Sequence, residues 1–265
     1  MPKFDANLTL LFNDLPFLAR FEAAAEAGFR GVEFQFPYAF DRNEIADRLH
    51  ANGLVAVLHN LPAGDWDAGE RGIACHPGRV GEFQDGVGRA IEYATALGCA
   101  RLNCLAGVPP ADLAPAQAHE ILVANLRFAA RELKAAGIRL LIEPINTFDI
   151  PGFHLHHSAQ AIALIDAVGA DNLFLQYDVY HMQRMEGELA NTIARHLPRI
   201  GHIQIADTPG RHEPGSGEIN YPWLFDFIDR IGYTGWIGCE YRPAAGTREG
   251  LAWMHSATTG RARSD

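Results

Sequence analysis

Lysine is nearly missing from this chain of 265 residues. Of its 22 basic side chains only Lys3 and Lys134 are lysines, so the other 20 are arginines. Lys3 lies at the terminus and Lys134 near the end of an expected helix, which leaves no well-placed amine for Schiff-base chemistry on a carbonyl substrate. The GxxxxGK[ST] phosphate-binding loop is also absent. These absences exclude imine-forming aldolases and P-loop enzymes.

Paired cysteines, long apolar runs and excess positive charge are lacking too. The four cysteines form no CxxC pair, and the first residues contain no basic segment followed by an apolar one. No apolar run approaches the roughly 18 residues of a membrane span. The net charge of −10 opposes nucleic-acid binding, which depends on a basic surface. We expect a cytoplasmic protein with reduced thiols and no nucleic-acid or membrane partner.

A repeated pattern is present instead: a helix-like stretch, a glycine, and a short apolar run that ends on a polar residue. It recurs in AGFRGVEFQF, NGLVAVLHN, LGCARLNCL, AGIRLLIEP, VGADNLFLQYD and IGYTGWIGCEY. Glycine accepts the left-handed backbone that ends a helix, and the apolar run that follows is typical of a buried strand. The segments FDANLTLLF and RIGHIQIAD raise the number of expected strands to eight.

The eight strands are expected at residues 4–10, 31–36, 54–60, 100–105, 139–143, 173–178, 200–206 and 236–241. Eight βα units predict an α/β fold of the (β/α)8 TIM-barrel type. We expect one barrel domain over residues 1–258 and a polar tail over residues 259–265.

Helix signals lie between the expected strands. Asp14 is a plausible N-cap before Pro16, and Asp41 with Glu44 resembles a capping box. A further helix over residues 115–136 carries one apolar stripe, formed by Leu122, Leu126, Ala129 and Leu133.

Polar residues lie at or near the ends of the four strands in the second half of the chain. Glu143, Asp178, Gln204 and Glu240 are separated by 35, 26 and 36 residues, about one βα unit each. Residues at these strand ends face the mouth of a parallel barrel, where its enzymes build their sites. Three carboxylates there would repel one another and lose hydration unless a cation neutralised them. Oxygen donors favour Mg²⁺ or Mn²⁺ over Zn²⁺. The alternative is that each acid pairs separately with an arginine.

Three histidines are predicted to contact a substrate at the same mouth. His59 ends the third expected strand, and His181 follows the sixth. Strand alternation turns His202 inward together with Gln204, where it contacts the substrate or instead orients Gln204 or Glu240.

Two loops complete the predicted site. Residues 61–78 form a glycine-rich connection that is too long to be ordinary, and Trp66 within it is expected to cover the substrate. Arg211 follows the seventh strand and is the expected anchor of an anionic substrate, because a guanidinium binds a carboxylate through two hydrogen bonds. Pairing of Arg211 with Glu213 or Glu218 is the alternative.

Other polar residues give weaker signals. Glu33 is a candidate to orient His59 or Glu240. Three amides also lie near strand ends, where they either belong to the site or only close the apolar core with polar groups. They are Asn7, Gln35 and Asn103. The histidines at 154, 156 and 157 lack the cysteines or the HExxH helix that would indicate zinc.

Several segments resemble the bacterial hydroxypyruvate isomerase family, which belongs to the xylose-isomerase-like barrels and includes 2-oxo-tetronate isomerases. They include LHNLPAGDWDAGERGIACHPGR, QYDVYHMQRMEGEL, GHIQIAD and GWIGCEYRP, and the similarity runs from about residue 4 to residue 253. The resemblance implies a divalent metal on Glu143, Asp178, Gln204 and Glu240. It also implies that Glu143 and Glu240 exchange a proton with the substrate. Related ketose epimerases usually carry histidine in place of Gln204, so their sugar chemistry does not transfer directly.

The expected reaction is the interconversion of hydroxypyruvate and tartronate semialdehyde through an enediolate, with metal polarisation and two glutamates as acid and base. Isomerisation of a 2-oxo-tetronate is the alternative. A sugar epimerase, a metal phosphoesterase and a non-catalytic barrel that binds an oxo acid are less favoured, and a homo-oligomer is compatible with the sequence. The expected partner is a small oxo acid.

Overall fold

Eight parallel strands close into one barrel in the computed structural model, which describes residues 2–254. The strands are β1 (Lys3–Asn7), β2 (Gly31–Phe34), β3 (Val55–Asn60), β4 (Arg101–Cys104), β5 (Arg139–Ile142), β6 (Leu173–Asp178), β7 (Ile200–Ile205) and β8 (Trp236–Cys239). Each strand pairs with the next along the chain, and β1 pairs with β8 from Lys3↔Trp236 to Ala6↔Cys239. The predicted (β/α)8 TIM barrel is confirmed.

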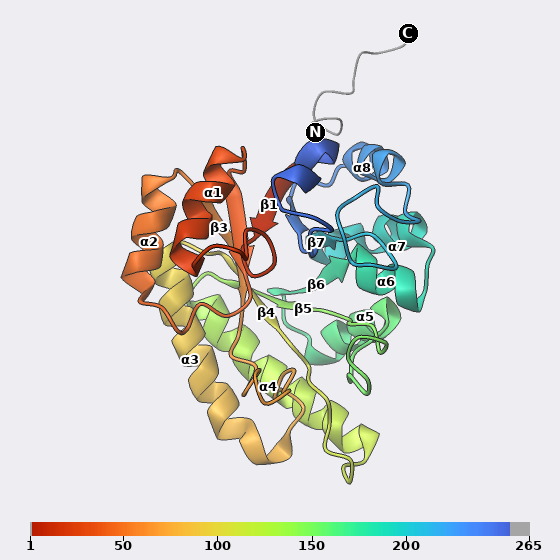
Figure 1. Cartoon of the computed structure of the whole chain (residues 1–265). Coiled ribbons are helices and arrows are strands. Elements are labelled where there is room, and N and C mark those ends of the chain that lie inside the picture. Colours follow the sequence, from red (N-terminus) through yellow and green to blue (C-terminus); the bar gives the residue numbers. More distant parts are fainter. Residues whose placement is uncertain (1, 255–265) are drawn as a thin grey trace.

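Helices surround the barrel (Figure 1). They are α1 (Arg20–Glu26), α2 (Arg42–Ala51), α3 (Val80–Leu97), α4 (Pro115–Ala135), α5 (Ser158–Val168), α6 (Val179–Met185), α7 (Leu189–His196) and α8 (Tyr221–Arg230), with short 3-10 helices at Phe17–Ala19, Pro77–Arg79, Leu197–Arg199 and Glu249–Leu251. Helix α4 ends one residue before its predicted end and buries the predicted stripe. Each buried leucine of that stripe contributes about 1.5–3 kcal/mol, so the stripe fixes which face of α4 meets the barrel.

Two local predictions about the N-terminal region are wrong. Asp14 caps no helix: a 3-10 turn begins after Pro16, and α1 starts only at Arg20. The residue before a proline avoids helical backbone angles, so a helix cannot run from Asp14 through Pro16. The first strand stops at Asn7 because the N–H groups of Leu10 and Leu11 fold back onto its carbonyl. Asp41 does cap α2, accepting a 2.7 Å bond from Asn43 N.

The barrel interior contains hydrogen-bonded polar side chains as well as apolar ones. Glu33 on β2 and His202 on β7 are 2.7 Å apart, although β1 and β8 lie between their strands. The second oxygen of Glu33 accepts hydrogen bonds from Asn7 and Gln204. Burying these groups without partners would cost several kcal/mol, of the order of 2–7 for each. Their mutual bonds therefore stabilise a polar layer beneath the mouth.

All four cysteines are buried and free. Among the described helices, none combines the length and the hydropathy that crossing a lipid bilayer demands. The predicted boundary at residue 258 lies outside the described residues.

Candidate active site

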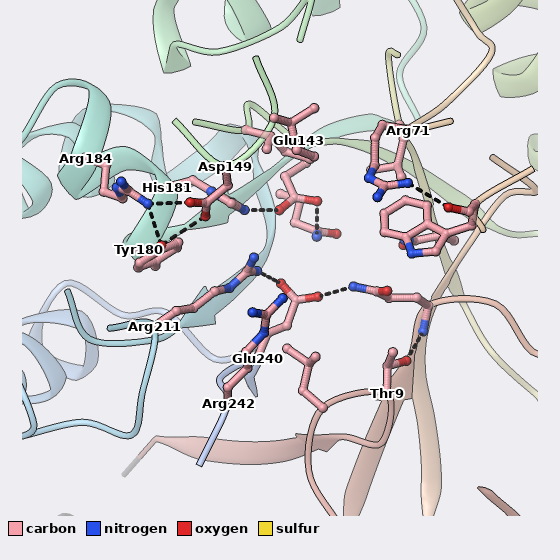
Figure 2. A pocket seen from close by; sticks show the side chains of 18 of the residues that line it. Thr9, Arg71, Glu143, Asp149, Tyr180, His181, Arg184, Arg211, Glu240 and Arg242 are labelled. Carbon is pink, nitrogen blue, oxygen red and sulfur yellow. Dashed lines mark hydrogen bonds and ion pairs between the residues drawn. The ribbon is translucent and has the colours of Figure 1, made fainter. Parts of the chain in front are cut away.

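A cavity of about 590 Å³ lies at the carboxyl ends of the barrel strands. Glu143 and Glu240, the residues directly after β5 and β8, line it together with His181 and Arg211. The loop after β3 adds Trp66 and Arg71 to its wall, as expected for residues 61–78. Figure 2 shows Glu143, Glu240 and Arg211 converging on its centre. The volume is in the usual range for a small-molecule site.

Three carboxylates with perturbed protonation lie at or beneath this cavity: Glu143 and Glu240 line it, and Asp178 is fully buried. Burial, followed by the charges of Glu240 and Asp178, raises the pKa of Glu143 well above its usual value. Burial raises the pKa of Asp178 to about 7, although nearby Arg211 opposes the shift. Burial also raises the pKa of Glu240. Each shift means that negative charge at this place is costly, and a cation would relieve that cost.

The free carboxylate oxygens fit a metal ion. Asp178 Oδ1 accepts a bond from Tyr180 N, while its Oδ2 is buried without a hydrogen-bond partner. Glu143 Oε2 accepts bonds from Asn103 and Gln176, and its Oε1 lies 3.8 Å from His181 Nε2. One atom each of Glu143, Asp178 and His181 lie within 4.8 Å of one another. The carboxylates of this group could bind a metal ion, and their oxygen donors suit a hard divalent cation.

His181 presents a proton to the carboxylates. The backbone N–H of Asn146 donates to its Nδ1 at 3.4 Å, and the Asn146 amide lies 2.6 Å from the same atom. Burial and the charges of Arg211 and Arg184 lower the pKa of His181 well below 6.5, so the ring is neutral. Because Nδ1 accepts, the ring carries its proton on Nε2, 3.5 Å from Asp178 Oδ2. The side chain is therefore a donor at the cavity wall.

Arg211 pairs with site carboxylates rather than with its neighbours in sequence. Its Nη2 lies 2.8 Å from Glu240 Oε2 and 3.6 Å from Asp178 Oδ2. The alternative partners are engaged elsewhere: Glu213 accepts from Ala244 N and Glu218 from Thr208. Arg211 has a left-handed backbone (φ +56°), which is uncommon for a residue other than glycine and is often retained where function requires it.

A buried aspartate that the sequence did not single out holds the Arg211 loop. Asp207 accepts four backbone hydrogen bonds of 2.9–3.1 Å, from Thr208, Gly215, Gly217 and Ile219. Its backbone also bridges to His212, beside Arg211. The only available signal was its place directly after the seventh strand.

A family model described as xylose isomerase-like TIM barrel matches residues 21–257. The chain belongs to that family. The hydroxypyruvate isomerase of Escherichia coli (strain K12) is 59% identical over 254 residues, which cover 96% of this chain and 98% of that protein. The 2-oxo-tetronate isomerase of Cupriavidus necator is 51% identical with the same coverage. The resemblance inferred from the sequence is thus confirmed, and the protein is an isomerase.

Comparison with solved structures gives the same fold. A Brucella melitensis protein described as AP endonuclease, family 2, matches with a TM-score of 0.94 and 47% identity, covering 96% of this chain and 98% of that chain. The 3-keto-D-glucoside 4-epimerase YcjR of E. coli matches with a TM-score of 0.81 at 20% identity, covering 97% of this chain and 99% of that chain, and shares the fold.

Gln204 of the isomerase is tied into the polar layer. Its amide oxygen accepts a 2.6 Å bond from Gln176, whose amide also donates to Glu143, and its amide nitrogen donates to Glu33. An amide oxygen has a second lone pair, so Gln204 can still coordinate a cation. Gln176 was missed in the sequence, although strand alternation turns it the same way as Asp178, two residues later.

Two predicted substrate contacts lie outside the cavity wall. His59 is fully buried, stacks on Phe34, and directs Nδ1 toward Tyr38 and the Asn60 carbonyl. His202 lies beneath the mouth against Glu33, and orients Gln204 only through that glutamate. We therefore exclude both from the substrate contacts proposed below. His181, Trp66 and Arg211 do line the cavity.

The weaker candidates surround the two glutamates. Asn7 and Gln35 donate to Glu240 Oε1 at 3.2 and 3.1 Å, and Asn103 donates to Glu143 Oε2 at 2.9 Å. Glu33 reaches Glu240 through Asn7, and its hydrogen bonds join it to Asn7, His202 and Gln204 rather than to His59. The amides therefore position the acids rather than merely covering the core.

Proposed function

We propose that this isomerase interconverts hydroxypyruvate and tartronate semialdehyde, with Glu143 and Glu240 as the catalytic acid and base. The observation that carries the proposal is that these two carboxyl groups line one cavity together with two hydrogen-bond donors, His181 and Arg211. A carboxylate beside the substrate can take a proton from one carbon, and a second carboxyl group can return a proton to its neighbour.

The proposed proton transfer needs a base near C3 and an acid near C2 of the substrate. One glutamate accepts the C3 proton, and the C–H electron pair forms the C2–C3 double bond of an enediolate. C2 then receives a proton, and the proton of the C3 hydroxyl passes to the C2 oxygen, so that C3 becomes the aldehyde and C2 carries the hydroxyl. His181 Nε2–H and the Arg211 guanidinium are donors at this cavity for the oxygens on which negative charge develops.

Glu143, Asp178, Gln204 and Glu240 would hold a divalent cation, Mg²⁺ or Mn²⁺ by the preference of hard ions for oxygen donors. Such an ion would supply Lewis-acid polarisation of the substrate oxygens, which acidifies the C3–H bond. The observation that supports this set is that the buried Asp178 Oδ2 accepts no hydrogen bond from residues 2–254.

A 2-oxo-tetronate, with one more carbon, is the second candidate substrate. The 51% identical relative from C. necator is a 2-oxo-tetronate isomerase, and a cavity of about 590 Å³ has room for either acid.

The test is a comparison of turnover on both acids before and after metal removal. Purified protein is assayed by proton NMR with hydroxypyruvate and with a 2-oxo-tetronate, then after chelation, and again after addition of Mg²⁺, Mn²⁺ or Zn²⁺. We expect the higher kcat/KM with hydroxypyruvate, loss of turnover on chelation and recovery with Mg²⁺ or Mn²⁺. Full activity after chelation would refute the proposed metal dependence. Inactivity on both acids would refute the proposal that the substrate is a small 2-oxo acid.

A further inference from the structure

Four arginines line the cavity, and two of them already have carboxylate partners. Arg211 pairs with Glu240 and Asp178, and Arg184 pairs with Asp149 at 2.5 Å. The remaining two are Arg71 and Arg242. Figure 2 shows these two on different sides of the cavity.

Arg71 is held in place without an acidic partner. Its Nη1 donates to the carbonyls of Trp66 and Glu70 at 2.9 and 2.7 Å, and its guanidinium lies 4.1 Å from the centre of the Trp66 ring. Among residues 2–254, its polar partners are thus two backbone carbonyls, neither of which neutralises its charge. The other guanidinium N–H groups remain available to an anion in the cavity.

The loop around Arg71 is fixed on both sides. Glu70, which precedes it, accepts the Asp65 N–H and forms an ion pair with Arg79. Gly72, which follows it, has φ +114° and lies so close to the Leu105 carbonyl that an added Cβ would be 2.5 Å from that oxygen. A guanidinium on such a segment loses little conformational entropy when it binds an anion.

Arg242 differs from Arg71 in this respect. Its side chain is exposed, and its described hydrogen bonds use only its backbone. Binding through Arg242 would order a long side chain at a cost of about 0.5–1.5 kcal/mol. The side chain of Arg71 is therefore held more firmly before an anion binds than that of Arg242.

We propose that Arg71 binds the carboxylate of the substrate and makes the isomerase selective for 2-oxo acid monoanions over neutral ketoses. This inference rests on the proposed function. The charges support it: a divalent cation and Arg211 together balance Glu143, Asp178 and Glu240, and Arg184 balances Asp149. Arg71 and Arg242 then leave the cavity positive, and an anionic substrate matches that sign.

The test compares an anion with a neutral analogue that undergoes the same reaction. Dihydroxyacetone keeps the hydroxyketone of hydroxypyruvate and replaces the carboxylate with a hydroxymethyl group. Arg71→Met retains an apolar stem on Trp66, and Arg71→Lys retains the charge. Arg139→Met is the matched control, because Arg139 is an exposed guanidinium 5.3 Å from the Phe174 ring centre, at the start of β5 and outside the cavity lining.

Arg71→Met should lower kcat/KM for hydroxypyruvate roughly 10- to 100-fold, chiefly through KM, since a charged hydrogen-bonded pair is lost. Dihydroxyacetone turnover should be the same as in the wild type. Arg71→Lys should recover part of the loss, and Arg139→Met should match the wild type with both compounds. Equal losses on the two compounds would mean a structural defect and overturn the inference.

A binding measurement separates this inference from the proposed function. Calorimetry with Mn²⁺-loaded protein compares D-glycerate, an anion, with glycerol. Wild type should bind glycerate more tightly, and Arg71→Met should weaken that binding while leaving glycerol unaffected. Absence of turnover on both acids would refute only the proposed function. Unchanged glycerate affinity in Arg71→Met, no glycerate binding by the wild type, or a loss found only in Arg242→Met would refute the role of Arg71.

Discussion

Arg211 donates to Glu240 across 2.8 Å, so a guanidinium occupies one oxygen of a proposed metal ligand. The same group lies 3.6 Å from Asp178. It therefore competes with a cation for negative charge while serving as a donor at the cavity. Removing it should separate these two effects.

Arg211→Met should lower turnover on hydroxypyruvate by about 10²-fold, the size expected for one preorganised donor to developing charge. Mn²⁺ should bind at least as tightly as to the wild type, because the competing charge is gone. Mn²⁺ titration followed by electron paramagnetic resonance measures the affinity. Arg184→Met is the control, because it removes the ion pair with Asp149 instead, and it should leave the Mn²⁺ affinity unchanged. Weaker Mn²⁺ binding in Arg211→Met would contradict this account.

Glu143→Gln and Glu240→Gln should each lower kcat by about 10²–10⁴-fold, the usual contribution of an acid or base. Metal-free Glu143→Gln should unfold at the wild-type temperature or above it, because burial makes the charged form of Glu143 unfavourable. Metal-free Glu240→Gln should unfold below the wild-type temperature, because both oxygens of Glu240 accept hydrogen bonds and one of them pairs with Arg211. Thermal unfolding by circular dichroism and initial rates check both parts. Glu92→Gln, on an exposed ion pair with Arg42, should retain full activity. Activity near the wild-type level in either active-site variant would refute its catalytic role.

Gln176→Leu should weaken metal binding by about 10–100-fold, since this amide holds both Glu143 and Gln204 in position. Asn125→Leu is the matched control: it removes a buried amide that donates to the Ala74 carbonyl, away from the cavity lining. Both variants should lose stability in chemical unfolding. Only Gln176→Leu should change Mn²⁺ affinity, and equal affinity changes in the two variants would argue against a positioning role.

His59 should make the fold acid-sensitive. Burial lowers its pKa to about 4, whereas in the unfolded chain it titrates near 6.5. Between these values the unfolded state binds more protons, so stability falls as the pH falls from about 6.5 toward 4. His59 should account for a loss of about 2 kcal/mol between pH 7.5 and pH 5.

Urea unfolding of His59→Gln at the two pH values checks this expectation. The variant should lose less stability on acidification than the wild type, whereas the exposed His50→Asn should behave as the wild type does. An identical pH dependence in His59→Gln and wild type would mean that this side chain is not held neutral by the fold.

Most of the barrel follows from local sequence. Glycine at the end of a helix, followed by an apolar run, is a short-range signal that precedes six of the eight strands. All eight strands and their order could therefore be predicted, with errors of a few residues at strand ends such as Asn7. The placement of Glu143, Asp178 and Glu240 at one mouth follows from the same rule, since parallel strands present their carboxyl ends together.

The partners of these residues depend on pairing across the barrel. Register shifts between Val32 and Glu33 and between Leu175 and Gln176 alter which side chains meet, and no periodicity in the sequence reveals them. His59 was expected at the mouth and instead stacks on Phe34, which it opposes across β2 and β3.

The sequence alone therefore determined the barrel, the acids at its mouth and the scarcity of lysine that makes arginine the available cation. The tertiary structure decided which charges neutralise one another. Arg211 meets Glu240, 29 residues away, rather than Glu213 or Glu218. Glu33 meets His202, 169 residues away, and Arg71 faces the cavity with no acidic partner among the described residues. Local patterns set which way a strand residue points, but electrostatic pairing depends on distances between strands that only closure of the barrel establishes.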